Sequence, residues 1–349
     1  LFRSVNIGFN RVQRFLLTMA AFVVVVAGMR ASQDILIPFL LSLFIAIITM
    51  PLLNWLRSKG IPTWAAILII ILTILVAGFL IAVLVGSSLT DFSNSLPSYQ
   101  RGLQSKLNDA LAFFEEKGFN IVDQTFMEFI DPGAAMRLTS KILTGMGNLL
   151  GDTFLILLVV VFMLLEAATF SQKIEKAIPT ESPEMDRLNG FLENINRYMV
   201  IKTWTSLGTG TIVTIWLSIW RVDYALLWGL LTFLFNYIPN IGSIMAAVPP
   251  FLLALVTLGP WTALAVALGY LAVNMTIGSF LEPRLMGRGL GLSTLVVFLS
   301  LLFWGWVLGP VGMILSVPLT MTMKIALSSF DETQWLSALL DGGSSVKTS

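Results

Sequence analysis

The chain has 349 residues, of which 56% are hydrophobic and only 12% are charged, and its net charge is +1. Soluble proteins carry about 25% charged residues, so the composition excludes an ordinary soluble protein and gives no case for nucleic-acid binding. The sequence has no cysteine and no histidine, which excludes disulfides, thiol nucleophiles, histidine-ligated zinc and imidazole acid–base chemistry. No Gly-x-x-x-x-Gly-Lys loop is present either. We therefore expect no enzyme, no cofactor and no metal site.

Long apolar blocks indicate helices that cross a membrane. Trp64–Gly86 gives 23 residues without a charge, and Leu36–Leu53 gives another 18. Such stretches cover roughly 27–34 Å as helices, enough for a hydrocarbon core of about 30 Å. We predict three N-terminal spans at 13–31, 35–54 and 64–86, forming a first region, 1–86. Basic residues before the first span and after the second place the N-terminus in the cytoplasm.

Charged residues return in 87–150, which we predict to be a small extracytoplasmic insert of amphipathic helices. Leucines and aromatic residues recur there every three or four positions from Leu96 to Phe114, as on one face of a helix. Asp131-Pro132 favours the start of another helix. The apolar face must pack on its own helices, on the membrane surface or on a neighbouring subunit.

The region 151–220 returns the chain to the cytoplasm and back. Span four is expected at 152–168, a cytoplasmic amphipathic helix at 170–199 and span five at 200–220. Ser182-Pro183-Glu184 is typical of a helix start, and an apolar stripe continues from there into span five. One long helix emerging from the cytoplasm into the bilayer is the simplest interpretation.

The region 221–327 contains two similar broken segments and is predicted to be the transport core. The first has a short arm, Tyr224–Asn236, a turn at 237–242, and a second arm from Ser243 to Leu258 that is interrupted at Val248-Pro249. After the full-length segment 261–281, the second has an arm from Leu292 to Phe303, a Gly/Pro turn at 304–312 and an arm interrupted at Val317-Pro318. A cytoplasmic tail, 328–349, follows, for a total of about eight membrane segments.

Broken helices at membrane depth leave backbone groups that protein or a water-filled cavity must satisfy. Paired Gly/Pro-interrupted short segments therefore indicate the substrate site of a transporter. Two interpretations remain open, which are re-entrant hairpins and ordinary kinked spans. First arms of about 13 residues favour re-entrant hairpins.

Polar groups and turn residues near these breaks are the candidates for the solute pathway. They are Asn236, Pro239, Asn240, Gly242, Ser243, Asn274, Gly309, Pro310, Gly312 and Pro318. The amides and hydroxyls among them carry the donors and acceptors that a polar solute needs. The alternative is that they only hold neighbouring helices together.

Three charged residues near the cytoplasmic end of 261–281 are candidates for a gate. Glu282 and Arg284 are two positions apart and would face away from each other on one helix, but Pro283 is expected to break that helix. They would then form an ion pair or gating latch, with Arg288 as a second basic group. The alternative is a cluster of charges that reach toward interfacial water.

Three C-terminal motifs resemble those of the bacterial autoinducer-2 exporter family: Asn236–Gly242 (NYIPNIG), Leu281–Gly287 (LEPRLMG) and Leu308–Met313 (LGPVGM). The resemblance covers nearly the whole chain. It implies an inner-membrane transporter that exports autoinducer-2, a small polyhydroxylated signal, in quorum sensing. It also implies a homo-oligomer in the lipid membrane, with a pentamer favoured. Some relatives are associated with sodium–proton antiport.

Three functions follow as hypotheses. The first is export of a small polar solute, autoinducer-2, which suits uncharged amide and hydroxyl groups at the hairpin turns. The second is sodium (or lithium)–proton antiport, which would need a carboxylate within the membrane, with Glu282 the nearest. The third is a scaffold that transports nothing and binds a partner through its extracytoplasmic insert.

Overall fold

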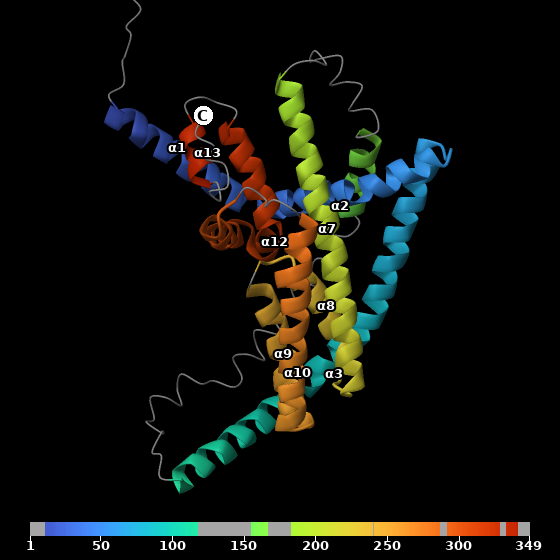
Figure 1. Cartoon of the computed structure of the whole chain (residues 1–349), viewed down its shortest axis with the longest axis vertical. Coiled ribbons are helices and arrows are strands. Elements are labelled where there is room, and N and C mark those ends of the chain that lie inside the picture. Colours follow the sequence, from blue (N-terminus) through green and yellow to red (C-terminus); the bar gives the residue numbers. More distant parts are fainter. Residues whose placement is uncertain are drawn as a thin grey trace, which may run out of the picture.

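The computed structural model describes residues 11–117, 155–166, 183–239, 241–286, 292–328 and 333–340 (Figure 1). Regular structure in these residues is helical, with no strand among them, as the composition predicted. Four helices are long and apolar enough to cross a membrane: Gln33–Ser58, Thr63–Lys106, Pro260–Met286 and Thr294–Ser328. Four shorter apolar helices are Leu16–Ala31, Leu155–Glu166, Ala225–Phe235 and Ile241–Thr257. The prediction of a multi-pass helical membrane protein is confirmed.

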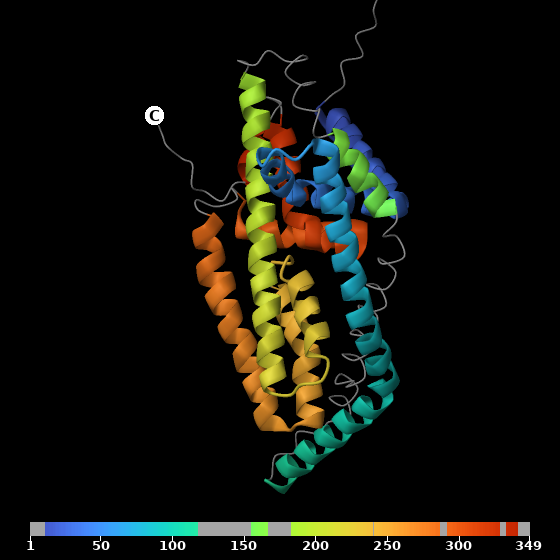
Figure 2. The same cartoon turned by 90° about the vertical axis from the view of Figure 1, so that its right-hand side faces the viewer.

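The N-terminal part consists of α1 (Arg11–Ala31), α2 (Gln33–Ser58) and α3 (Thr63–Glu116). Helix α3 does not end with the third apolar block but continues through 86 into the expected insert. It bends in its second half, which contains Pro97 (Figure 2). Proline within a helix commonly causes such a bend. Buried Phe92 holds α3 to the rest of the fold through an edge-on contact with Trp228, at 5.3 Å between ring centroids. The expected helix start at Asp131-Pro132 lies outside the described residues.

Helix α7 (Pro183–Ile219) is a single helix of 37 residues. It joins the second half of the expected cytoplasmic helix to span five, so the prediction of one continuous helix is confirmed. It begins at Pro183. Proline suits the first turn of a helix, because the backbone N–H that it lacks would have no hydrogen-bond partner within the helix there. It ends where Arg221 adopts a left-handed conformation, with φ of 55°.

The first hairpin has the predicted arms. Helix α8 (Ala225–Phe235) is 11 residues long, too short to cross a bilayer, and a turn leads into α9 (Ile241–Thr257). Helix α10 (Pro260–Val273) follows and runs beside α7 (Figures 1 and 2). It continues as the π-helix η1 (Asn274–Leu281) and then as α11 (Glu282–Met286).

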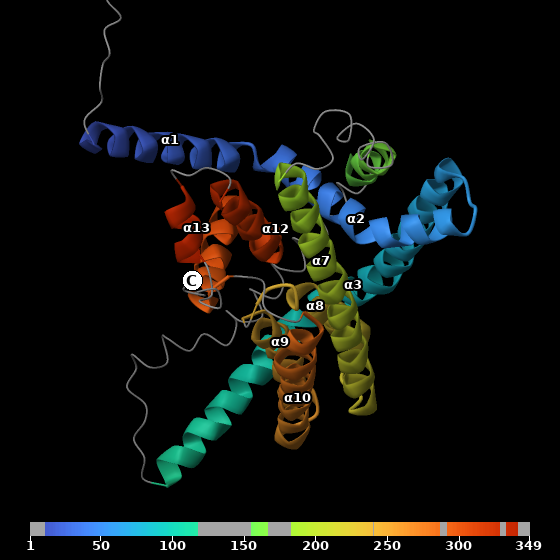
Figure 3. The ribbon, with the colours of Figure 1, turned by 45° about the horizontal axis from the view of Figure 1, so that its top comes forward.

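The second hairpin is α12 (Thr294–Ser328), whose two arms meet at Gly309. Gly309 has φ of 65° and ψ of −151°, a conformation that only glycine adopts without strain. The Trp304 indole N–H donates to the Thr320 hydroxyl at 3.0 Å, so the second arm folds back against the first. Figure 3 shows α1 lying across this end of the molecule, where it contacts α12, and α13 (Gln334–Leu340) also packs on α12.

The expected proline breaks within the arms are wrong. Pro249 lies inside α9, Pro318 lies inside the second arm of α12, and the helix continues from η1 into α11 through Pro283. Neighbouring helices and local π-helical turns compensate for a missing N–H, so proline in a membrane helix does not have to end it. The break in the second hairpin is at Gly309, where the backbone conformation changes.

Candidate functional site

The tips of the two hairpins meet in the middle of the protein. Tyr237, in the first tip, belongs to one buried cluster with Val311 and Leu315, which follow the second tip. Met199 and Tyr198 of α7 complete the cluster from the side. The two segments singled out by their short arms therefore contribute to one buried cluster, although about 70 residues separate their turns.

Both tips are built in the same way around a glycine. A Cβ at Gly242 would overlap the carbonyl oxygen of Phe235, and a Cβ at Gly312 would overlap that of Trp304. In each hairpin the second arm thus begins directly against the last turn of the first arm. The repeat that was visible in the sequence as a pattern is also a repeat of close backbone contacts.

Three polar contacts connect α7 to the first tip and to α11. The Lys202 ammonium pairs with the Glu282 carboxylate at 2.6 Å. The hydroxyls of Thr203 and Tyr237 share a hydrogen bond at 2.8 Å. The Asn236 amide donates to the Ser206 hydroxyl at 2.9 Å. We call these six residues the polar seam. Three of them lie along one stretch of α7, two lie in the first tip and one begins α11.

Most of the polar seam is buried in this conformation, while Thr203 and Glu282 are half-buried. Ser206 is fully buried, Lys202 is 5% exposed and Asn236 is 9% exposed. A buried ion pair that loses one partner leaves an uncompensated charge, so neither Lys202 nor Glu282 is expected to lose the other without a large loss of stability. Charged residues buried in a membrane protein are costly and mark functional sites.

The π-helix η1 leads directly to this ion pair. The backbone N–H of Glu282 donates to the carbonyl of Ile277, five residues back, in place of the four of an α-helix. This widened turn shifts the residues after it around the helix axis, and it ends where Glu282 meets Lys202. Short π-helical turns occur frequently at functional sites.

The partner predicted for Glu282 is wrong. Arg284 is exposed and forms no ion pair with Glu282, since both stay on a continuous helix and point in different directions. Arg288 lies outside the described residues. The ion pair exists, but its basic partner is Lys202, 80 residues earlier in the chain.

Most of the predicted pathway residues lie at or near the two hairpin tips, and two of them line a separate groove. Asn236 belongs to the polar seam, and Pro239 and Gly242 complete the first tip. Gly309, Pro310 and Gly312 form the second tip, Pro318 is buried two turns beyond it, and Asn240 is outside the described residues. Ser243 and Asn274 face a groove of about 240 Å³ between α9 and α10, together with Tyr270.

Sequence reasoning missed Lys202, Thr203, Ser206 and Tyr237. Lys202 lies near the start of the expected span five, 200–220. Its position inside an apolar segment was the available signal, because such residues usually pair within the protein. Within the described residues, no group of three acidic side chains could hold a metal ion.

A family model described as the AI-2E family transporter matches residues 18–331. The chain belongs to the AI-2E transporter family. The AI-2 transport protein TqsA of Escherichia coli is 40% identical over 94% of this chain and 95% of its own length. A Haemophilus influenzae relative is 42% identical over 94% of this chain and 96% of its own length. YhhT of Escherichia coli is 37% identical, with 94% of each chain covered.

The names of all three relatives refer to transport. The structure places the three sequence motifs that this AI-2E transporter shares with its family. The first forms the tip of the first hairpin, the second begins at the end of η1 and contains Glu282, and the third forms the tip of the second hairpin. All three lie at or beside the meeting point of the tips and the polar seam.

Proposed function

We propose that this AI-2E transporter exports a small polar solute, autoinducer-2, across the bacterial inner membrane in quorum sensing. The observation that carries the proposal is the polar seam, in which an ion pair and two hydrogen-bonded pairs connect α7 to a broken helix tip. The 40% identity to TqsA, which is named for AI-2 transport, supports this solute.

The chemistry of the seam suits a neutral solute with several hydroxyl groups. Hydroxyls and amides donate and accept, so they can exchange hydrogen bonds with each other for hydrogen bonds with a polyol. Lys202 and Glu282 neutralise each other, so the seam presents no net charge to a solute. A solute with a full charge would have to leave its hydration shell without a compensating counter-charge.

One buried acceptor in this region has no partner of its own. The Oδ1 atom of Asn196 is buried and accepts no hydrogen bond within the described residues. Asn196 precedes Thr203 by two turns of α7, so both lie on the same face of the helix. Buried polar atoms are normally paired. We assign this oxygen as a contact for a solute hydroxyl.

In this conformation the seam is closed, because its groups bond to one another. Transport then requires the hairpin tips to move away from α7, so that the solute replaces the contacts between Asn236 and Ser206 and between Tyr237 and Thr203. Alternating access in secondary transporters moves one group of helices against another around a central site.

Counterflow of labelled autoinducer-2 into proteoliposomes tests the proposal. The unsubstituted chain should accumulate label above empty liposomes, and Asn196→Leu and Asn236→Leu should reduce the rate by about tenfold, the cost of roughly one unpaired polar contact. Arg284→Ala, which changes an exposed residue of α11, is the matched control and should retain the rate. Uptake no higher than in empty liposomes would refute the proposed solute.

A second candidate function is sodium (or lithium)–proton antiport. The observation that favours it is the half-buried carboxylate of Glu282, since an antiporter needs an ionisable group that is alternately protonated and bound to a cation. Its pairing with Lys202 argues for a structural role. Proton flux reported by a pH-sensitive dye after sodium addition separates the two functions. Antiport predicts flux that Glu282→Gln abolishes, and export predicts no sodium-dependent flux in either variant.

We also propose that both termini are cytoplasmic and that the protein assembles as a homo-oligomer, with a pentamer favoured. Native mass spectrometry of the detergent-solubilised chain gives the subunit number, and a monomer under all conditions would refute the assembly. The scaffold hypothesis depends on the insert 87–150, of which 118–150 lies outside the described residues. It predicts that deletion of 92–145 removes the biological effect and leaves solute flux unchanged.

A further inference from the structure

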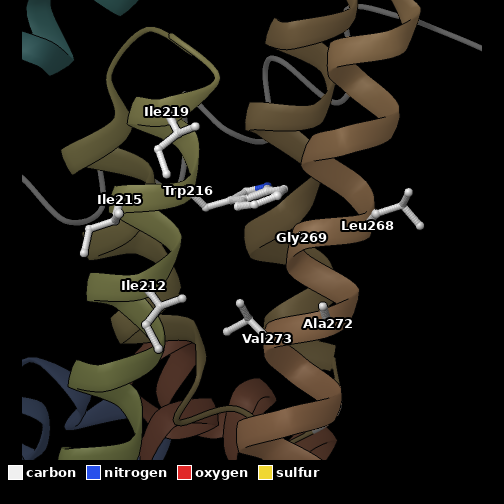
Figure 4. A pocket seen from close by; sticks show the side chains of 8 residues that line it. All are labelled: Ile212, Ile215, Trp216, Ile219, Leu268, Gly269, Ala272 and Val273. Atoms are coloured by element: carbon white, nitrogen blue, oxygen red, sulfur yellow. The ribbon is translucent and has the colours of Figure 1, made fainter.

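An apolar groove of about 490 Å³ runs between α7 and α10 (Figure 4), and it shares no lining residue with the Ser243 groove. Its walls are aliphatic. Ile212, Ile215 and Ile219 form the wall on α7, and Leu268, Ala272 and Val273 form the wall on α10. Ile215 and Leu268 are each 55% exposed, so the groove is open along its length.

Trp216 explains why these two helices leave a groove. Its ring lies between α7 and α10 against Gly269 (Figure 4), where a Cβ would overlap the indole. Its indole N–H donates to the carbonyl of Ala265 at 3.1 Å. The ring thus acts as a fixed spacer between the helices, and its one polar atom is satisfied. The groove therefore offers an occupant only apolar contacts.

The end of the groove near Ile219 has a different character. Trp220 packs on Trp216 with 6.0 Å between ring centroids, and Trp261, at the start of α10, is 82% exposed. Tryptophans gather where a membrane protein passes from the hydrocarbon core to the lipid headgroups. This end of the groove therefore lies at headgroup level, and the aliphatic part extends into the hydrocarbon.

Arg221 adds a positive charge at the same end. It is exposed and forms no ion pair within the part of the chain that the structure describes. It also occupies the left-handed position that ends α7, where the N–H of Val222 donates to the carbonyl of Leu217. Glycine is the usual residue there, and another residue costs roughly 1–2 kcal/mol.

We propose that the groove between α7 and α10 binds a phospholipid of the surrounding membrane. One acyl chain lies between Ile215 and Leu268, and the phosphate binds the guanidinium of Arg221. Acyl chains are as apolar as the bilayer around them, so the groove alone gives little selectivity. The phosphate contact is charge-assisted and provides most of the preference for this position.

Native mass spectrometry of the full-length chain in detergent, titrated with phosphatidylglycerol, tests the proposal. The unsubstituted chain should retain bound lipid as detergent is stripped. Arg221→Ala should weaken the apparent affinity by about tenfold or more, as expected for loss of a charge-assisted contact, and Arg221→Lys should recover most of it. Ala272→Phe, at an exposed position on the groove wall, should displace the acyl chain and also lower the affinity.

Arg57→Ala is the matched control, because it removes an exposed basic residue near the end of α2 that does not line the groove between α7 and α10. It should bind phosphatidylglycerol like the unsubstituted chain. Thermal unfolding in detergent shows that each variant is folded. Unchanged lipid affinity in Arg221→Ala or in Ala272→Phe would overturn the proposal. A change of subunit number in Ala272→Phe with lipid affinity unchanged would also overturn it, because a second copy of the chain would then occupy the groove.

Discussion

The N-terminal helices and the hairpin core use their hydrophobic residues in opposite ways. Only 12% of the most apolar window of α3 is buried within the chain, against 39% of that of α12. The core also buries polar groups, among them Lys202, Ser206 and Asn236. In α3 the hydroxyl of Thr73 bonds only to the backbone of its own helix.

The difference shows which part is specified by packing and which by solubility in lipid. A helix that faces lipid needs to be apolar, and many sequences satisfy that requirement. A helix that carries buried ion pairs and close glycine contacts needs particular residues at particular positions. Matched substitutions in the two regions should therefore have unequal effects.

The largest inequality is expected between two lysines. Lys202→Met leaves the half-buried carboxylate of Glu282 unpaired, which should cost up to about 3 kcal/mol of stability. Lys59→Met, in the exposed turn after α2, should leave stability unchanged. Unfolding of purified protein in mixed detergent micelles measures both. Adding Glu282→Leu to Lys202→Met should recover part of the loss, and a further loss in the double variant would contradict the pairing.

Glycines should give the next largest contrast. Gly242→Ala and Gly312→Ala place a methyl group against a carbonyl oxygen of the opposite arm and should each cost about 1–3 kcal/mol. Gly78→Ala, in α3, meets no atom within 4 Å and should be neutral or stabilise by about 0.5–1 kcal/mol. The same unfolding assay applies. Equal effects at Gly78 and Gly242 would show that the tips are not tightly packed.

Two threonines give a smaller and cleaner comparison. Thr203 and Thr73 both donate to the carbonyl four residues back, at 2.7 and 2.8 Å, but only Thr203 also contacts a tyrosine hydroxyl. Thr203→Val should therefore cost roughly 0.6–1.7 kcal/mol more than Thr73→Val. A cycle with Tyr237→Phe isolates the contact. No coupling between the two substitutions would remove Thr203 and Tyr237 from the polar seam.

The smallest effect is expected on the lipid-facing surface of α3. Phe79 is 69% exposed, and Phe79→Ala should change the stability of the single chain by less than about 0.5 kcal/mol. If α3 faces a neighbouring subunit instead of lipid, the same substitution will lower the subunit number seen by native mass spectrometry. That result would show that the N-terminal region has specified contacts of its own.

Short sequence patterns predicted the positions of most of these helices correctly. Ser182-Pro183 marked the start of α7, and the expected arm Tyr224–Asn236 is found as Ala225–Phe235. The expected turn at 304–312 was too wide, because the helix continues to Leu308 and only Gly309 departs from it. The hydrogen bond between Trp304 and Thr320 holds that last turn of the arm in place. No local sequence pattern predicts this hydrogen bond.

The pairing of distant residues was not predictable in the same way. Arg284 was chosen as the partner of Glu282 because it is near in sequence, whereas Lys202 is near only once α7 and α11 are packed. The predictions that prolines would break the helices were wrong for a related reason. Whether a proline ends a helix depends on what surrounds the unpaired carbonyl, and that is a tertiary property.

The π-helix makes chain length, in addition to residue identity, a determinant of the ion pair. One residue turns an α-helix by about 100°, so η1 shifts the direction in which Glu282 points relative to a regular continuation of α10. Deleting one residue from η1, such as Gly278, would restore regular winding and turn an otherwise intact carboxylate away from Lys202. The count of residues between Pro260 and Glu282 is thus itself a requirement for the ion pair, which comparison of residue types alone would not reveal.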